Sequence, residues 1–68
     1  MIWFFEREGT RLACEFRSRV DGPGYELEWT DLSGHVRIER SDDVDQLTQR
    51  LEEIQKLLQR DGWKRSPV

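Results

Sequence analysis

The chain has 68 residues, of which eleven are basic and fourteen acidic, for a net charge of −3. This length allows one small domain, which buries only about 60% of its unfolded surface and often gains stability by association. Cys14 and His35 are the only cysteine and histidine, so a disulfide within the chain is excluded, and these two residues cannot complete a zinc site alone. The acidic balance argues against a general binder of phosphate backbones. The expected partner is therefore a second copy or another protein.

Three turn signals divide the first forty residues into four expected strands. The signals are Glu8-Gly9, Asp21-Gly22-Pro23-Gly24 and Asp31-Leu32-Ser33-Gly34. The strands are expected at residues 2–7, 10–20, 25–30 and 35–40. Because short loops join antiparallel neighbours, these strands should form a meander.

The turn positions also predict which side chains lie opposite each other. Four pairs of opposite charge result, namely Glu6–Arg11, Arg17–Glu28, Arg19–Glu26 and Glu28–Arg37. In this register the core face should carry Trp3, Phe5, Leu12, Cys14, Phe16, Val20, Tyr25, Leu27, Trp29, Val36 and Ile38. The outer face should carry Arg17, Arg19, Glu26, Glu28, Arg37 and Glu39, which is the pattern of a solvated surface.

After Ser41 the apolar residues follow the period of a helix rather than that of a strand. They recur in steps of three and four at Val44, Leu47, Leu51, Ile54 and Leu58. An acidic cluster precedes this stripe, with Ser41, Asp42 or Asp43 as the cap, and Gly62 suits the end of the helix. The predicted fold is α+β, a four-stranded antiparallel β-meander with one C-terminal amphipathic helix on one face. A single ββββα domain should span residues 1–63, with a flexible tail at 64–68.

The stripe also fits a coiled-coil seam, which is the alternative interpretation. However, it is shorter than two full heptads, and Leu57 widens it. Packing on the sheet is therefore favoured.

The expected first strand is apolar on both faces. With Trp3 and Phe5 toward the helix, Ile2 and Phe4 point outward, and Ala13 lies across from Phe4. Edge strands usually carry charges, prolines or bulges that prevent pairing, and residues 2–5 have none. Ile2, Phe4 and Ala13 are thus predicted to form a self-association or partner surface. The alternative is that these side chains rest under the basic tail or on arginine stems.

No catalytic, cofactor or metal site is predicted. Cys14 falls within a strand on the core face, which is typical of a buried thiol. His35 opens a strand with no carboxylate or cysteine placed to form a dyad. Arginines flank the acidic cluster of Glu26, Glu28 and Glu39 and should keep it ionised, the opposite of what a general acid needs. We therefore expect a protein that is not an enzyme and has no evident small-molecule ligand.

The expected location is the cytoplasm. The apolar run at residues 2–5 is far shorter than the roughly 20 residues of a membrane-spanning helix, and it lacks the features of a signal peptide. One lone thiol and no export signal fit a reducing compartment.

The run Trp3-Phe4-Phe5-Glu6-Arg7 is similar to the opening of a family of small uncharacterised bacterial proteins. The resemblance covers these five residues and the general layout of strands, acidic helix start and Trp ending, and it implies no assigned activity. In element order alone, the chain is similar to the PC4-like single-stranded-DNA-binding coactivators, which are dimers. That resemblance implies an alternative function, a single-stranded nucleic-acid-binding module. No motif residue carries over, and the basic, aromatic-bearing sheet surface is missing, so nucleic-acid binding is not the favoured function.

Overall fold

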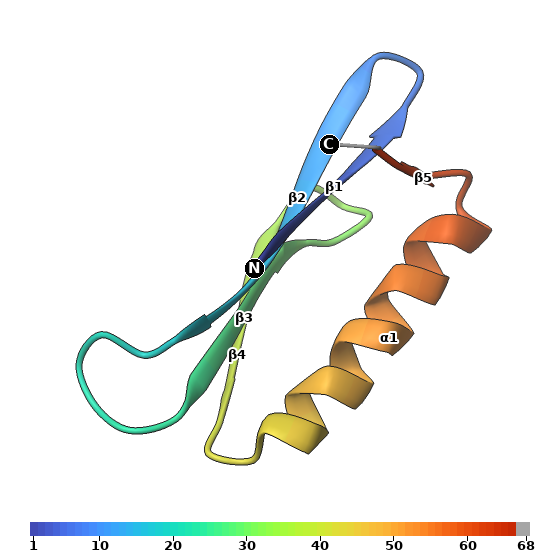
Figure 1. Ribbon diagram of the computed structural model, residues 1–68. Helices are drawn as coiled ribbons and strands as arrows, with labels where there is room; N and C mark the ends of the chain where they lie inside the picture. Colours follow the sequence, from blue (N-terminus) through green and yellow to red (C-terminus); the bar gives the residue numbers. More distant parts are fainter. Residues whose placement is uncertain (67–68) are drawn as a thin grey trace.

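A computed structural model describes residues 1–66 as a twisted antiparallel sheet with one helix across one face (Figure 1). The elements are β1 (Ile2–Arg7), β2 (Thr10–Ser18), β3 (Tyr25–Thr30), β4 (Val36–Ser41), α1 (Val44–Arg60) and β5 (Lys64–Arg65). The strands lie in the order β4-β3-β2-β1-β5, with every neighbouring pair antiparallel. The predicted α+β class, with a meander followed by one helix, is confirmed.

The first hairpin has the predicted register. Glu8 and Gly9 form a two-residue loop in which both residues have positive φ, 50° and 81°. This is the backbone conformation that a tight hairpin between right-twisted strands requires. Glu6 consequently lies opposite Arg11, as expected from the sequence.

The second hairpin is shifted by two residues from the predicted register. Arg17 lies opposite Glu26 rather than Glu28, because β2 ends at Ser18 and the loop is longer than four residues. The backbone N–H of Arg19 donates to the carbonyl of Gly24, which closes that loop at 3.0 Å. A shift by two leaves each side chain on its predicted face. The prediction that Val20 lies in the core was wrong, since Val20 is in the loop and exposed.

The third hairpin is shifted by one residue, which reverses the faces of β4. The backbone N–H of Asp31 donates to the carbonyl of His35 at 2.9 Å, so the loop has three residues rather than four. Gly34, with φ of 89°, takes the left-handed position that such a loop needs. The prediction that Val36 and Ile38 lie in the core was therefore wrong: they point outward and are 63% and 44% exposed.

The core lies between α1 and the inner face of the sheet. Its buried members are Phe5, Cys14, Leu27 and Trp29 from the strands, Leu47, Leu51, Ile54 and Leu58 from the helix, and Trp63. Trp3, Leu12, Phe16 and Tyr25 pack against this cluster and are partly buried. The helical stripe is thus confirmed in four of its five predicted positions. The fifth, Val44, opens the helix and is 42% exposed.

Both ends of α1 are capped by the residues that the sequence indicates. The Asp43 carboxylate accepts hydrogen bonds from the backbone N–H groups of Asp45 and Gln46, at 2.9 and 3.3 Å. At the other end, Gly62 has φ of 88°, and the N–H of Trp63 donates to the Leu58 carbonyl at 3.0 Å. These contacts form a Schellman motif, which turns the chain back and buries Trp63.

The chain after Trp63 extends the sheet. Lys64 pairs with Glu6 and Arg65 with Phe5, and the N–H of Ser66 donates to the Phe4 carbonyl at 2.8 Å. This differs from the flexible tail expected from residue 64, of which positions 67 and 68 lie outside the described residues. The edge of β1 is therefore paired along Phe4–Glu6.

Candidate protein-interaction surface

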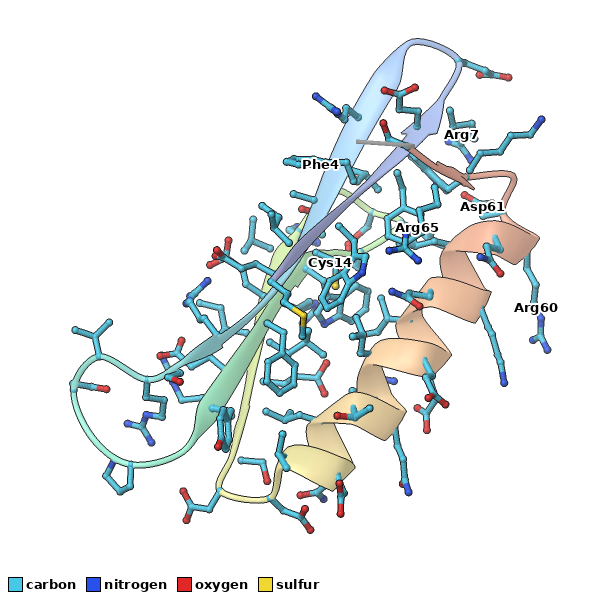
Figure 2. All side chains as sticks on the ribbon, in the orientation of Figure 1. Phe4, Arg7, Cys14, Arg60, Asp61 and Arg65 are labelled. Atoms are coloured by element: carbon cyan, nitrogen blue, oxygen red, sulfur yellow. The ribbon has the colours of Figure 1, made fainter. Side chains whose placement is uncertain are left out.

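The candidate surface is the face of the sheet opposite α1, here called the outer face. Figure 2 shows Phe4 on this side, whereas Cys14 lies between the sheet and α1. Alternation along the strands fixes the members of the outer face. They are Ile2, Phe4 and Glu6 of β1, Arg11, Ala13, Glu15 and Arg17 of β2, Glu26, Glu28 and Thr30 of β3, and Val36, Ile38 and Arg40 of β4.

Apolar residues lie on both outer strands of the meander. On one side Phe4 lies opposite Ala13, and Ile2 is next to them and 49% exposed. On the other side Thr30 lies opposite Val36, and Glu28 lies opposite Ile38. Ile2, Phe4 and Ala13 thus share one face, as the sequence predicted, and Val36 and Ile38 join them.

An arginine stacks on Phe4. The Arg11 guanidinium carbon is 4.3 Å from the centroid of the Phe4 ring, a cation–π geometry. Arg11 also approaches Glu6 at 3.8 Å and donates to the Ser66 hydroxyl at 3.5 Å. Phe4 is consequently half-buried. The alternative of apolar side chains resting on arginine stems therefore describes part of the ring, while Ile2 and Ala13 stay exposed.

A charged cluster fills the middle of the outer face. The Arg17 guanidinium donates to Glu15 at 2.7 Å, to Glu28 at 3.1 Å and to Glu26 at 3.3 Å. Arg40 approaches Glu26 at 3.7 Å. The hydrogen bonds with Glu28 and Glu15 raise the pKa of Arg17. Because each guanidinium is matched by a carboxylate, the cluster offers no excess of positive charge.

Sequence reasoning missed Val36 and Ile38 because it assumed a four-residue loop after Thr30. A signal was present in the chain. The Asp31 carboxylate accepts hydrogen bonds from the N–H groups of Ser33 and His35, both at 3.0 Å, and Gly34 follows Ser33. Asp followed three residues later by Gly is compatible with a type I turn and a left-handed glycine, the common three-residue hairpin.

The Asp31, Ser33 and His35 side chains lie within hydrogen-bond distance, but in the wrong order for a catalytic triad. The Ser33 hydroxyl donates to Asp31 at 2.6 Å and is 2.7 Å from Nδ1 of His35. A triad needs the histidine between the carboxylate and the hydroxyl, so that it can accept the proton. Here the serine is in the middle. The hydrogen bonds from Ser33 and Arg37 lower the pKa of Asp31, which suits a turn-stabilising carboxylate.

The Cys14 thiol is buried on the inner face, as predicted. Only 1% of the residue is exposed, and burial raises the pKa of the thiol to about 11. The protonated thiol is a poor nucleophile at neutral pH. Within residues 1–66, no group of three or more His, Cys, Asp and Glu side chains is arranged to hold a metal ion.

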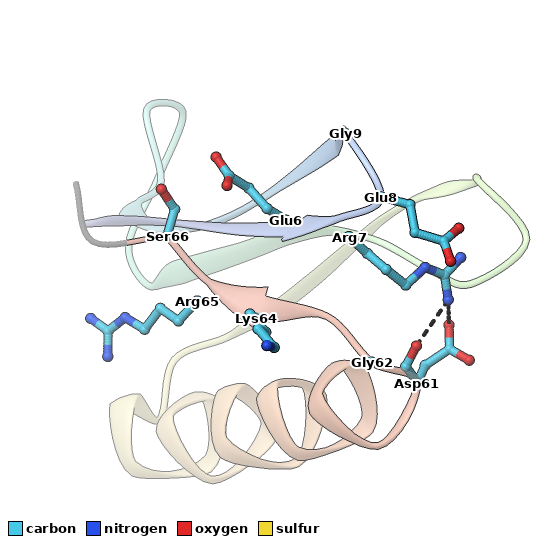
Figure 3. Close-up of a pocket in the computed structure, with 9 residues that line it drawn as sticks. All are labelled: Glu6, Arg7, Glu8, Gly9, Asp61, Gly62, Lys64, Arg65 and Ser66. Atoms are coloured by element: carbon cyan, nitrogen blue, oxygen red, sulfur yellow. Dashed lines mark hydrogen bonds and ion pairs between the residues drawn. The ribbon is translucent and has the colours of Figure 1, made fainter.

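A groove of about 820 Å³ lies where the β1–β2 turn meets the end of α1 (Figure 3). Three acidic and three basic residues line it, namely Glu6, Glu8, Asp61, Arg7, Lys64 and Arg65. Arg7 already donates to the side chain and to the carbonyl of Asp61, at 2.5 and 2.9 Å, and its guanidinium lies 4.8 Å from the Trp63 ring. This groove is an ion-paired junction between sheet and helix rather than a pocket of one charge.

Comparisons with protein-family models, curated proteins and solved structures found no match to this chain. None of the helices in the described part is long and apolar enough to cross a membrane.

Proposed function

We propose that this protein is a non-enzymatic interaction module whose outer face binds a second copy of the chain. One observation carries the proposal: apolar side chains from β1, β2 and β4 share the face that α1 leaves uncovered. They are Ile2, Phe4, Ala13, Val36 and Ile38. Stable association in water is driven mainly by the burial of such side chains.

The charges of the outer face favour a second copy over a polyanion. The face carries four carboxylates, from Glu6, Glu15, Glu26 and Glu28, and three guanidinium groups, from Arg11, Arg17 and Arg40. Each of these arginines lies within 4 Å of a carboxylate. Two nearly neutral faces repel each other little, whereas a nucleic-acid platform needs unpaired cations and several exposed aromatics.

The location that fits this function is the cytoplasm. The single thiol, Cys14, is buried in the core, so folding of the domain requires no oxidising compartment.

The test is the substitution Phe4→Glu, measured by light scattering behind a sizing column over a concentration series. We expect a lower average mass and an unchanged circular dichroism spectrum, because the charge is placed on the outer face and not in the core. Leu57→Glu is the matched control, since Leu57 is similarly exposed at 41% but lies on α1. Association equal to that of the wild type in the Phe4 variant would contradict the proposal.

Ala13→Glu provides a second variant in case Phe4→Glu perturbs the fold. Ala13 is exposed and opposite Phe4, so this substitution adds charge at the same place without removing a ring. Loss of association in this variant, with retained folding, supports the outer face. Retained association contradicts it.

The alternative function is a single-stranded nucleic-acid-binding module. Fluorescence anisotropy of a labelled single-stranded oligonucleotide, measured with the protein at low and moderate salt, distinguishes it from the proposed function. Phosphate contacts weaken steeply with salt. We expect no binding at low salt. Tight binding that falls with salt would favour the alternative.

A further inference from the structure

The strand β4 lies at the end of the sheet opposite β5, and no strand of residues 1–66 pairs with its second edge. The hydrogen bond from Asp31 to His35 identifies which backbone groups face that edge. In an antiparallel ladder, alternate residues direct both N–H and C=O toward the same neighbour. Since residue 35 is bonded to β3, residues 37, 39 and 41 also face β3. The N–H and C=O groups of Val36, Ile38 and Arg40 therefore point away from the sheet.

This edge has few of the features that prevent pairing. It is six residues long and contains no proline. Charged residues on the inner face of an edge strand often block addition of another strand. Arg37 and Glu39 occupy these positions, as their pairing with Trp29 and Leu27 shows. Their charges are opposite, so in a suitable register they attract.

We propose that β4 pairs antiparallel with β4 of a second copy, with Ile38 opposite the partner's Ile38. Only registers that place residues 36, 38 and 40 opposite one another satisfy the outward backbone groups. Centring the pair on Arg37 places two guanidinium groups together, and centring it on Glu39 places two carboxylates together. Centring it on Ile38 places Arg37 opposite the partner's Glu39, twice by symmetry.

Both charged side chains can accept this additional contact. Arg37 uses its Nε to donate to Asp31 at 2.8 Å, which leaves its two terminal nitrogens for another acceptor. The Glu39 carboxylate accepts from Trp29 at 2.8 Å and from Arg50 at 2.9 Å, and two carboxylate oxygens have about four acceptor positions. An open groove of about 450 Å³ beside them gives the partner's arginine access. It is lined by Trp29, Asp31, Arg37, Ile38, Glu39 and Arg50.

Edge pairing uses backbone hydrogen bonds and does not rest on the outer-face association proposed above. A two-fold pair through β4 would join the two sheets into one. The apolar contact at its centre is Ile38 against the partner's Ile38, on the outer face. Ile38 belongs to both surfaces, but Phe4 belongs to the outer face alone and the N–H of residue 38 serves the edge pair alone, so these two groups distinguish the surfaces.

Cysteine substitution tests the register directly. In the proposed pair the two copies of residue 38 have Cα atoms about 5.5 Å apart, within the range of a disulfide. The two copies of residue 36, or of residue 40, are about 14 Å apart along the strand. With oxidised glutathione, Ile38→Cys should form a covalent dimer, whereas Val36→Cys and Arg40→Cys on the same edge should stay monomeric. The wild-type chain is the blank, since Cys14 is buried.

Three results would overturn the edge pairing. They are equal cross-linking at positions 36, 38 and 40, cross-linking at none of them, and a wild-type chain that stays monomeric in light scattering at millimolar concentration.

The substitution Ile38→Pro distinguishes association through the β4 edge from association through the outer face. The N–H of Ile38 points away from β3, so proline at this position removes no hydrogen bond within the chain. It removes two hydrogen bonds across the proposed pair, one donated by each copy. We expect the dissociation constant to rise at least tenfold, roughly the effect of two lost hydrogen bonds. Ile38→Thr, which keeps the N–H, is the control. If Phe4→Glu lowers the mass and Ile38→Pro does not, edge pairing is wrong and the outer-face proposal stands; the reverse result supports edge pairing alone.

Discussion

Glu39 fixes the position of β4, and its removal should cost stability. Its carboxylate accepts hydrogen bonds from the indole of Trp29 at 2.8 Å and from Arg50 at 2.9 Å. Trp29 is only 7% exposed, so in Glu39→Ala its N–H would lose its partner inside the protein. An unsatisfied buried donor costs about 1–3 kcal/mol. Arg50 has a half-exposed side chain that water can solvate, and it adds little. We expect a loss of about 2 kcal/mol.

Ile38→Ala is the informative comparison because the two registers of β4 predict opposite results. In the structure Ile38 is 44% exposed, so truncation should cost about 1 kcal/mol or less. In the register expected from the turn positions, Ile38 would be in the core and its truncation would cost about 2–5 kcal/mol. Glu39 would then be solvated, and its loss would be within about 0.5 kcal/mol.

The assay is urea unfolding followed by circular dichroism, at two protein concentrations so that any association is detected. Glu53→Ala is the control, because it removes the other carboxylate near Arg50, at 3.1 Å, from an exposed position. This control should change stability by less than about 0.5 kcal/mol. A larger loss for Ile38→Ala than for Glu39→Ala would refute the register of β4.

Three further predictions concern single positions. Gly62→Ala should cost about 1 kcal/mol in thermal unfolding, because φ of 88° is strained for any residue with a Cβ. The folded pKa of Asp31 is depressed by Ser33 and Arg37, so its stabilisation is complete above the unfolded pKa, near 4, and is lost as pH falls below that value. Asp31→Asn should therefore weaken the decline of urea midpoints from pH 4 to pH 2. Cys14 should react with a thiol reagent only after unfolding, since its folded pKa is about 11.

The sequence was sufficient for the elements whose signals agree with each other. The pair Glu8-Gly9 is typical of a two-residue hairpin loop, and this loop sets the register in which β1 pairs with β2. The stripe of α1 coincides with a cap at Asp43 and a stop at Gly62, so its bounds were predicted closely. In both cases local backbone preference and the apolar pattern indicate the same structure.

The position of β4 was predicted wrongly because two local preferences conflict there. The apolar alternation of Val36 and Ile38 favours burying them, whereas the three-residue loop closed by Asp31 turns them outward. The loop geometry prevails because Glu39 then satisfies the Trp29 indole and binds Arg50 on the helix. These long-range contacts have no signal in a local window. Ile2, Phe4 and Ala13 were placed on the outer face in advance because the Glu8-Gly9 loop sets their register, whereas Val36 and Ile38 were assigned to the wrong face.

The pairing of β5 with β1 also bears on the order in which the edges of the sheet close during folding. β1 to β4 each bond to the strand before or after them, whereas Phe5 and Arg65 are 60 positions apart. Contacts between distant residues form late because a long loop must close first. The four strands of the meander can therefore pair while the Phe4–Glu6 edge of β1 is still open to other chains. The two residues of β5 then cover this edge, so a chain cut before Lys64 should expose the edge to pairing with other chains.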